Sequence, residues 1–383
     1  MTRFMLMLGV LCAPLLSLPA FGQTDFSNIV GHEKKPHKDT VLTTKPLPPA
    51  EAKRLEGKLH QIRDLLLATS ALKSLHGYDW ETFTTVKNHE DPARPVIASV
   101  TYIPFAYFKD PHSGKPISSE EGPPFSIHIN DPEAILGQGA FNVDREARFV
   151  AEPPSSGQMS GFPVFTAQFV VMSKRGQPVF TPISQERFLT RLIEKSRKEL
   201  DDINARFKGV KEDPAVTKRE IESRQAALKS ARAEQEQRWT TMQPKWPDRV
   251  AAERAKFDAK EKKALEEIEE LKTSSPRQRF LKPVETRQKA LEAELAGLSP
   301  AERAAPAYIP HGGSANKDRA SGLAPPGATD GTRIVTINPA LFDPKKPKSA
   351  IQLIILGTTM YSPRLFDEVQ NQLDKTALMK LIE

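Results

Sequence analysis

Cysteine is almost missing from this sequence, which has a single one, Cys12, among its 383 residues. It lies in an apolar stretch near the amino terminus, directly after Leu11, where a lipidation signal would require a small residue. A chain with one cysteine cannot form an internal disulfide, and we expect Cys12 to be removed with the segment that holds it. The remaining chain then has neither a thiolate nucleophile nor a thiolate metal ligand.

The sequence also lacks the short motifs that identify common enzymes. It contains no Gly-x-Ser-x-Gly elbow, and the glycines beside Ser160 have the wrong spacing to form one. A Gly-Lys-Ser/Thr phosphate loop is absent, and Gly137-Gln138-Gly139 lacks the third glycine of a dinucleotide fingerprint. We therefore predict no catalytic residue and no cofactor, although paired carboxylates for glycoside hydrolysis are recognised only in space.

Long apolar runs and charge of one sign are missing as well. No stretch after residue 22 is long and apolar enough to cross a bilayer, so the mature chain is predicted to have no transmembrane segment. The formal net charge of +7 permits contact with an anionic envelope polymer. Because acidic and basic residues are interspersed, unlike the basic stripe of a nucleic-acid-binding protein, we predict no nucleic-acid partner.

The amino terminus has the composition of a secretory signal peptide. Arg3 gives a positive start, residues 4–18 are apolar, and Ala20 and Gly22 supply the small residues of a cleavage site after Gly22. We expect residues 1–22 to be cleaved and the protein to be periplasmic or secreted, and the lack of cysteine favours a bacterial envelope. Residues 23–49 are polar and rich in proline, which predicts a disordered or extended lead-in.

Residues 183–305 are dominated by strong helix formers. Apolar side chains recur at three- and four-residue steps, as in Phe188, Leu192, Leu200, Ile203 and Phe207. Prolines at 214, 247 and 276 follow or accompany capping residues, and Pro300 ends the pattern. This punctuation predicts four helices of roughly 22–27 residues that pair as antiparallel coiled hairpins and form a helical arm.

Strand patterns occur on both sides of this arm. They cover residues 96–103, 125–130 and 161–173 before it, and 333–337 and 349–356 after it. Pro104 is predicted to mark a bend, and residues 174–177 a hairpin turn into Val179 and Phe180. In residues 125–130 the alternation places Phe125, Ile127 and Ile129 in the core and Ser126, His128 and Asn130 outside.

Neither flank has enough apolar residues for a core of its own. An amphipathic helix is predicted over residues 51–75, and another after Ser362-Pro363. We therefore predict an α+β fold with one mixed β-sheet domain built from residues 50–182 and 333–383, helices packed on it, and the coiled-coil-like arm inserted. The apolar segment 349–356 is its central strand, and residues 306–332 form a flexible loop.

Two groups of residues are candidates for sites. Histidine and carboxylate ligands suit zinc, and His112, His128, Asp131 and Glu133 lie on a turn, a strand and the next turn. Their spacing matches no known ligand pattern, so no metal is predicted. Trp239 and Trp246 flank the turn between the second and third helices, where they either pack the turn or form an apolar tip that meets a partner or a lipid surface.

Three functions are compatible with these features. The leading hypothesis is an exported, non-enzymatic interaction or envelope-associated protein that uses its helical arm to contact another protein. The second is a hydrolase or metal-dependent enzyme with a site near the sheet and residues 306–332. The third is a protein that binds a small apolar ligand between the sheet and the terminal helices. Partner identity and oligomeric state do not follow from the sequence.

Overall fold

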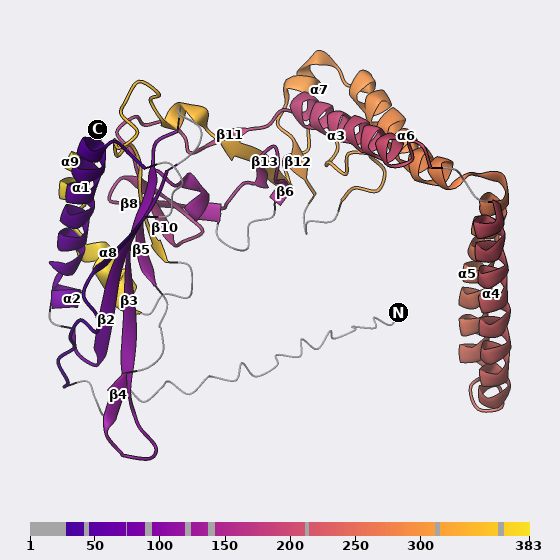
Figure 1. Ribbon diagram of the computed structural model, residues 1–383, viewed down its shortest axis with the longest axis horizontal. Helices are drawn as coiled ribbons and strands as arrows, with labels where there is room; N and C mark the ends of the chain where they lie inside the picture. Colours follow the sequence, from indigo (N-terminus) through magenta and orange to yellow (C-terminus); the bar gives the residue numbers. More distant parts are fainter. Residues whose placement is uncertain are drawn as a thin grey trace, which may run out of the picture. The chain divides into compact units, whose positions relative to one another are not determined.

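The computed structural model describes residues 28–41, 46–73, 75–88, 94–118, 124–136, 142–210, 214–310, 315–358 and 364–383. The expected signal peptide, with Cys12, lies outside these residues. The fold is α+β, as predicted, with mixed sheets and long helices (Figure 1). The chain forms two compact units, one of residues 1–181 with 335–383 and the other of residues 182–334.

The first unit contains a nine-stranded mixed sheet. Its order is β1-β2-β3-β5-β14-β10-β9-β8, and β4 pairs with β3. The strands are β1 (Lys38–Val41), β2 (Tyr78–Lys87), β3 (Ile97–Lys109), β4 (Pro116–Ser118), β5 (Phe125–Ile129), β8 (Ser155–Met159), β9 (Phe162–Phe165), β10 (Phe169–Met172) and β14 (Ile354–Thr358). Within the predicted lead-in, residues 38–41 form β1, an edge strand parallel to β2, so this part is extended and not disordered.

The two sequence halves share this sheet through β14. It lies between β5 and β10 and is antiparallel to both, with Ile355 opposite His128 on one side and Val171 on the other. The apolar segment 349–356 is buried throughout, but only its last three residues belong to the strand. The predicted central strand is therefore present, and it begins five residues later than expected.

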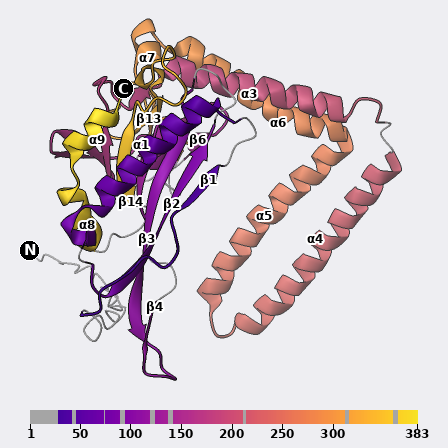
Figure 2. The same ribbon diagram turned by 60° about the vertical axis from the view of Figure 1, so that its left-hand side comes forward.

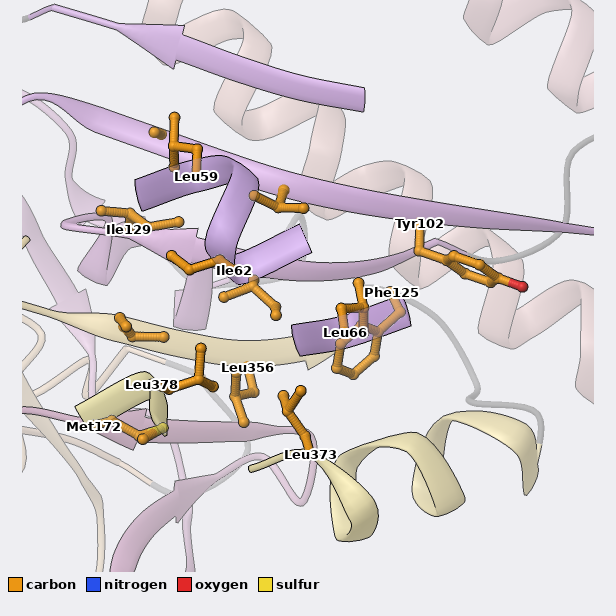
Figure 3. Packing of buried hydrophobic residues seen from close by; sticks show 14 of the residues in the cluster. Leu59, Ile62, Leu66, Tyr102, Phe125, Ile129, Met172, Leu356, Leu373 and Leu378 are labelled. Carbon is orange, nitrogen blue, oxygen red and sulfur yellow. The ribbon is translucent and has the colours of Figure 1, made fainter. Parts of the chain in front are cut away.

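Both faces of the sheet are covered at β10 and β14. Val170, Met172 and Leu356 pack in one apolar cluster with α1 (Pro49–Leu67), while Val171 and Ile355 pack in another on the opposite face. Figure 3 shows the first cluster, in which each buried leucine or isoleucine contributes about 1.5–3 kcal/mol. This first cluster also contains residues of α2 (Ser70–Lys73), α8 (Arg364–Gln372) and α9 (Lys375–Leu381).

The second cluster lies beneath a smaller sheet of order β11-β13-β7-β6, in which β12 also pairs with β13. Its strands are β6 (Asn142–Asp144), β7 (Phe149–Ala151), β11 (Phe180–Pro182), β12 (Tyr308–Ile309) and β13 (Thr332–Ile337). Ser126 and Asn130 are consequently buried, at 7% and 3% exposure. The prediction that these residues face outward is wrong, because alternation cannot reveal that a second layer covers the polar side.

Pro104 lies inside β3, opposite Trp80 of β2, and does not bend the chain. The Tyr107 N–H donates to the Gly77 carbonyl on the β2 side, so residue 104, three positions earlier, directs its nitrogen to the other side. On that other side β3 pairs with β5 only as far as Tyr102. The N–H that proline lacks therefore removes no hydrogen bond between the strands. The predicted bend is wrong for this reason.

Three other local predictions also differ from the structure. The helix expected over residues 51–75 is divided at Ala68 and Thr69, where the Thr69 hydroxyl donates to the Leu66 carbonyl at 2.9 Å. The strand expected over residues 161–173 is a hairpin, because Thr166 and Ala167 adopt positive φ between β9 and β10. The expected hairpin from β10 into β11 is absent, since these strands belong to different sheets.

The second unit holds the four predicted helices. They are α3 (Gln185–Arg206), α4 (Pro214–Met242), α5 (Pro247–Thr273) and α6 (Pro276–Gly297), followed by α7 (Pro300–Ala304). Figure 2 shows α3 beside α6 and α4 beside α5. Ser275 forms a capping box with Gln278, and a proline follows it at the first helical position.

The segment 306–332 is more structured than the predicted flexible loop. It contributes β12, and Leu323 is buried. Arg319 and Glu294 of α6 form an ion pair at 2.6 Å, with side-chain exposures of only 11% and 13%. Its residues His311 to Ser314 lie outside the described part of the chain.

Candidate functional site

A cavity of about 400 Å³ lies in the first unit, where residues from both sequence halves meet. It lies beside two 3-10 turns, η2 (Pro132–Leu136) and η4 (Pro339–Leu341). Its lining residues are Arg94, Pro95, Ile97, Asn130, Asp131, Pro132, Glu133, Ile337, Asn338, Pro339, Phe342 and Pro344. The wall of the cavity is therefore mainly apolar and carries a few polar side chains, as in many sites for small molecules.

Asn130 fixes the geometry of this cavity. It directly follows β5 and has φ of 55°, a left-handed conformation that asparagine tolerates better than most residues. Its Nδ2 donates to the carbonyls of Val96 and Ala350 at 3.0 and 2.9 Å. Its Oδ1 accepts from the N–H groups of Gln352 and Leu353 at 2.8 and 3.1 Å. One side chain thus joins the amino- and carboxy-terminal halves directly before Asp131.

Asp131 is the group in this cavity that can exchange a proton near neutral pH. Burial, and then the charge of Glu133, raise the pKa of its carboxyl to about 6, against the weaker opposing effects of backbone hydrogen bonds from Glu133 and Ala134 and of the charge of Lys87. Glu133 is half exposed and lies 3.3 Å from Arg148. A carboxyl with this pKa is suited to general acid–base chemistry or to hydrogen bonding with a polar ligand.

The structure does not bring the four predicted metal-ligand candidates together. Asp131 and Glu133 line the cavity, but His112 is exposed in the turn between β3 and β4, where its N–H donates to Asp110. His128 lies in β5 with a buried Nε2 that has no hydrogen-bond partner, and burial lowers its pKa to about 4. No three of them lie close enough to share an ion.

A second candidate surface is the hairpin of α4 and α5. Trp239, the one buried side chain of α4, is 1% exposed. Arg232 of α4 forms ion pairs with Glu236 of the same helix and with Asp258 and Glu261 of α5, at 2.9, 2.5 and 2.8 Å. Few apolar side chains are buried in this hairpin, and ion pairs between acidic and basic residues surround them.

Trp246 differs from Trp239 although both flank the same turn. It precedes the first residue of α5 and is 51% exposed. Trp239 fills the interior of the hairpin and is not available to a partner unless the helices separate. Of the two predicted partner-binding residues, Trp246 is therefore the one that presents an apolar surface to solvent.

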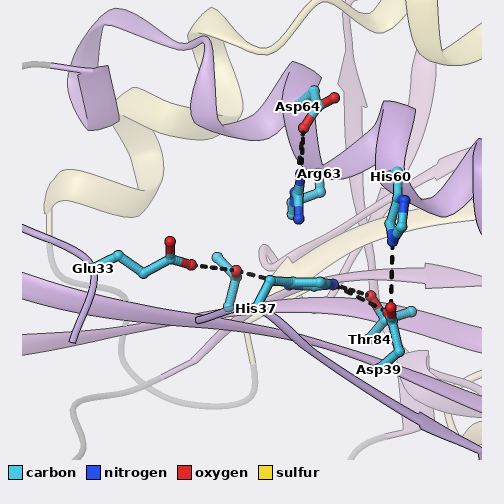
Figure 4. A network of polar contacts seen from close by, with 8 residues as sticks. Glu33, His37, Asp39, His60, Arg63, Asp64 and Thr84 are labelled. Atoms are coloured by element: carbon cyan, nitrogen blue, oxygen red, sulfur yellow. Dashed lines mark hydrogen bonds and ion pairs between the residues drawn. The ribbon is translucent and has the colours of Figure 1, made fainter. Parts of the chain in front are cut away.

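A third candidate site is a cluster of polar side chains that was not predicted from the sequence. His37, just before β1, Asp39 of β1 and His60 of α1 have nitrogen and carboxylate atoms within 4.8 Å of one another (Figure 4). Among the described residues, no other three histidine or carboxylate side chains form such a group. The alternation of His37 and Asp39 was the available signal, but it lies in a segment predicted to be disordered.

Comparisons with known proteins add no assignment to these sites. No protein-family model, curated protein sequence or solved structure matches the chain. Among the helices of the described residues, none has both the length and the apolar character needed to cross a membrane.

Proposed function

We propose that the chain is an exported, non-enzymatic protein that binds a partner protein through the α4–α5 hairpin. The observation that carries the proposal is the exposure of Trp246, 51%, at the turn of a helical hairpin. Tryptophan is one of the residue types enriched among the energetic centres of protein interfaces.

The charges of the hairpin favour a protein over an anionic polymer. Arg224 pairs with Glu220 at 2.8 Å, Arg249 with Glu253 at 3.0 Å, and Lys272 with Glu269 at 2.5 Å. Basic side chains that are already neutralised by neighbours offer little net attraction to a polyanion. Mixed charge around an apolar centre is instead the usual composition of a protein interface.

The contacts at the base of the hairpin suggest a direct test. The rings of Phe207 and Phe280 lie 5.8 Å apart, and Arg277 donates to Asn204 at 2.7 Å, so the end of α3 adjoins the start of α6. Residues 211–274 can therefore be replaced by a linker of about six Gly and Ser residues, which spans up to about 20 Å. The α3–α6 pair and the first unit are retained.

The experiment is affinity capture after chemical crosslinking in the producing cells, with quantitative mass spectrometry. We expect at least one protein to be recovered at least tenfold less with the linker variant and with Trp246→Ala. Lys245→Ala, which changes an exposed neighbour of Trp246, is the matched control and should recover it fully. Equal recovery of all proteins by the three variants and the wild type contradicts the proposal.

Export is proposed from the sequence of residues 1–22. The test is the mass of the amino-terminal peptide of the protein isolated from its producing cells. Cleavage after Gly22 gives a mature chain that begins at Gln23. A protein that retains residues 1–22 in the cytoplasm contradicts this part of the proposal.

The second candidate function is binding or turnover of a small molecule at Asp131. The cavity volume of about 400 Å³ and the raised pKa of Asp131 favour it. A metabolite mixture screened by ligand-observed NMR against the wild type and Asp131→Asn tests this alternative. A ligand that binds the wild type and loses affinity with the variant supports the cavity as a site.

A further inference from the structure

The side chains of His37, Asp39 and His60 converge where β1 meets α1. Asp39 lies between the two imidazoles, with its Oδ1 3.1 Å from His37 Nε2 and its Oδ2 3.4 Å from His60 Nε2. The two rings meet edge to face at a centroid distance of 5.8 Å (Figure 4). Both nitrogens thus face one carboxylate from different elements of the fold.

The hydrogen bonds behind His37 determine which of its nitrogens carries a proton. The Thr82 hydroxyl donates its one hydrogen to the Glu33 carboxylate at 3.2 Å, and its oxygen lies 2.9 Å from His37 Nδ1. Since that oxygen can then only accept, His37 Nδ1 carries the hydrogen. In the neutral imidazole the lone pair is therefore on Nε2 and points toward Asp39.

A nitrogen lone pair and a carboxylate that face each other are two donor groups that one cation can bridge. The Thr84 hydroxyl lies 2.9 Å from the same Nε2, and its single hydrogen can go to that nitrogen or to the Asp39 carboxylate, but not to both. The carboxylate and the two imidazoles have ligand atoms within 4.8 Å of one another, close enough to share one ion.

We propose that His37 Nε2, His60 Nε2 and the Asp39 carboxylate bind one zinc ion. Two histidines and one carboxylate are a frequent protein ligand set for zinc with an open position. Ligand bonds of about 2.0–2.2 Å in a tetrahedron place the ligand atoms roughly 3.4 Å apart, so the present separations of up to 4.8 Å require small side-chain movements. The Glu33–Thr82–His37 chain is the outer hydrogen-bonded support that such histidines have.

The exposure of the proposed ligands leaves room for a fourth ligand on the zinc ion. The His37 side chain is only 10% exposed, whereas those of His60 and Asp39 are 37% and 45% exposed. Asp39 also lines a cavity of about 330 Å³ whose other lining residues include Leu47, Leu55 and Leu59. The ion therefore lies at the rim of an apolar cavity and is open to solvent, and this site is independent of the α4–α5 hairpin.

Equilibrium dialysis and calorimetry on metal-free, untagged protein test the site at pH 7. We expect one Zn²⁺ per chain, and visible absorption bands of a four-coordinate ion when Co²⁺ is used instead. His60→Ala and Asp39→Ala should each weaken zinc binding at least tenfold, and Thr82→Val, which keeps all three ligands, about 10–100-fold. His112→Ala removes an exposed histidine outside the group and should bind as the wild type does.

Circular dichroism of each variant shows whether it folds, and Thr82→Val keeps the test valid if a ligand variant does not. Zinc affinity should fall as the pH is lowered from 7 to 5, because protons compete for the imidazole nitrogens. Binding of less than one zinc per chain, or equal binding by His60→Ala and the wild type, contradicts the proposal.

Discussion

The indole of Trp239 in α4 meets the ring of Phe257 in α5 edge to face, with the ring centroids 5.6 Å apart. The guanidinium groups of Arg232 and Arg254 lie 5.7 and 5.1 Å from the centre of the same indole. Because α4 buries no other side chain, this contact is the main source of stability at the outer end of the hairpin.

Replacement of Trp239 by alanine should therefore open the hairpin. We expect a loss of about 3–5 kcal/mol in the stability of α4 and α5, the usual cost of removing a buried aromatic residue. Trp246→Ala removes the same side chain from an exposed position and should change that stability by less than about 0.5 kcal/mol. Hydrogen exchange over residues 214–273 measures both, and equally fast exchange in the two variants contradicts this account.

Asn130 should be the most sensitive polar residue of the first unit. Asn130→Ala leaves four buried backbone groups without their partners and places alanine at a positive φ, so we expect a loss of at least about 3 kcal/mol. Asn338, on the same cavity, makes two such hydrogen bonds at ordinary φ, and Asn338→Ala should cost about half as much. Urea unfolding measures both variants.

Asp131 should make the first unit less stable as the pH rises from about 4 to 6. Its pKa is about 6 in the folded chain, above the value of about 3.9 for an unfolded aspartate, so the folded state retains a proton that the unfolded state releases. The loss is up to about 3 kcal/mol above pH 6. Asp131→Asn should match the wild type at pH 4 and exceed its unfolding free energy at pH 7.

His128 should have the opposite effect over an overlapping range. Burial lowers its pKa to about 4, below the value of about 6.5 for an unfolded histidine, so the unfolded state binds the extra proton. Stability should fall as the pH decreases from about 6.5 to 4, by up to about 3 kcal/mol. The unfolding free energy of His128→Leu relative to that of the wild type should rise as the pH decreases across that range. A difference in unfolding free energy that does not change with pH contradicts the prediction.

The helices of the second unit were predictable because their signals are local. Pro214, Pro247 and Pro276 each occupy the first position of a helix, and Ser275 caps the last of these three helices. The central strand was predictable from its apolar composition, which a strand covered on both faces requires. Its late start was not, because residues 349–353 are buried without regular pairing.

The candidate sites depend on contacts between residues far apart in the sequence, which a local sequence pattern cannot reveal. Thr82 orients His37 from 45 positions away in sequence, and Asn130 binds Leu353 from 223 positions away. Polar residues on strands also appear solvent-facing until the second layer is known, as with Ser126. The separate environments of Trp239 and Trp246 likewise depend on how α4 and α5 pair, which spacing alone does not determine.

The most direct measurement of the central claim is photo-crosslinking in the producing cells from a benzophenone side chain at position 246. The account predicts a discrete adduct with another protein from position 246 and none from position 198, an exposed residue of α3 outside the hairpin. No adduct from position 246, or the same adducts from both positions, would contradict it.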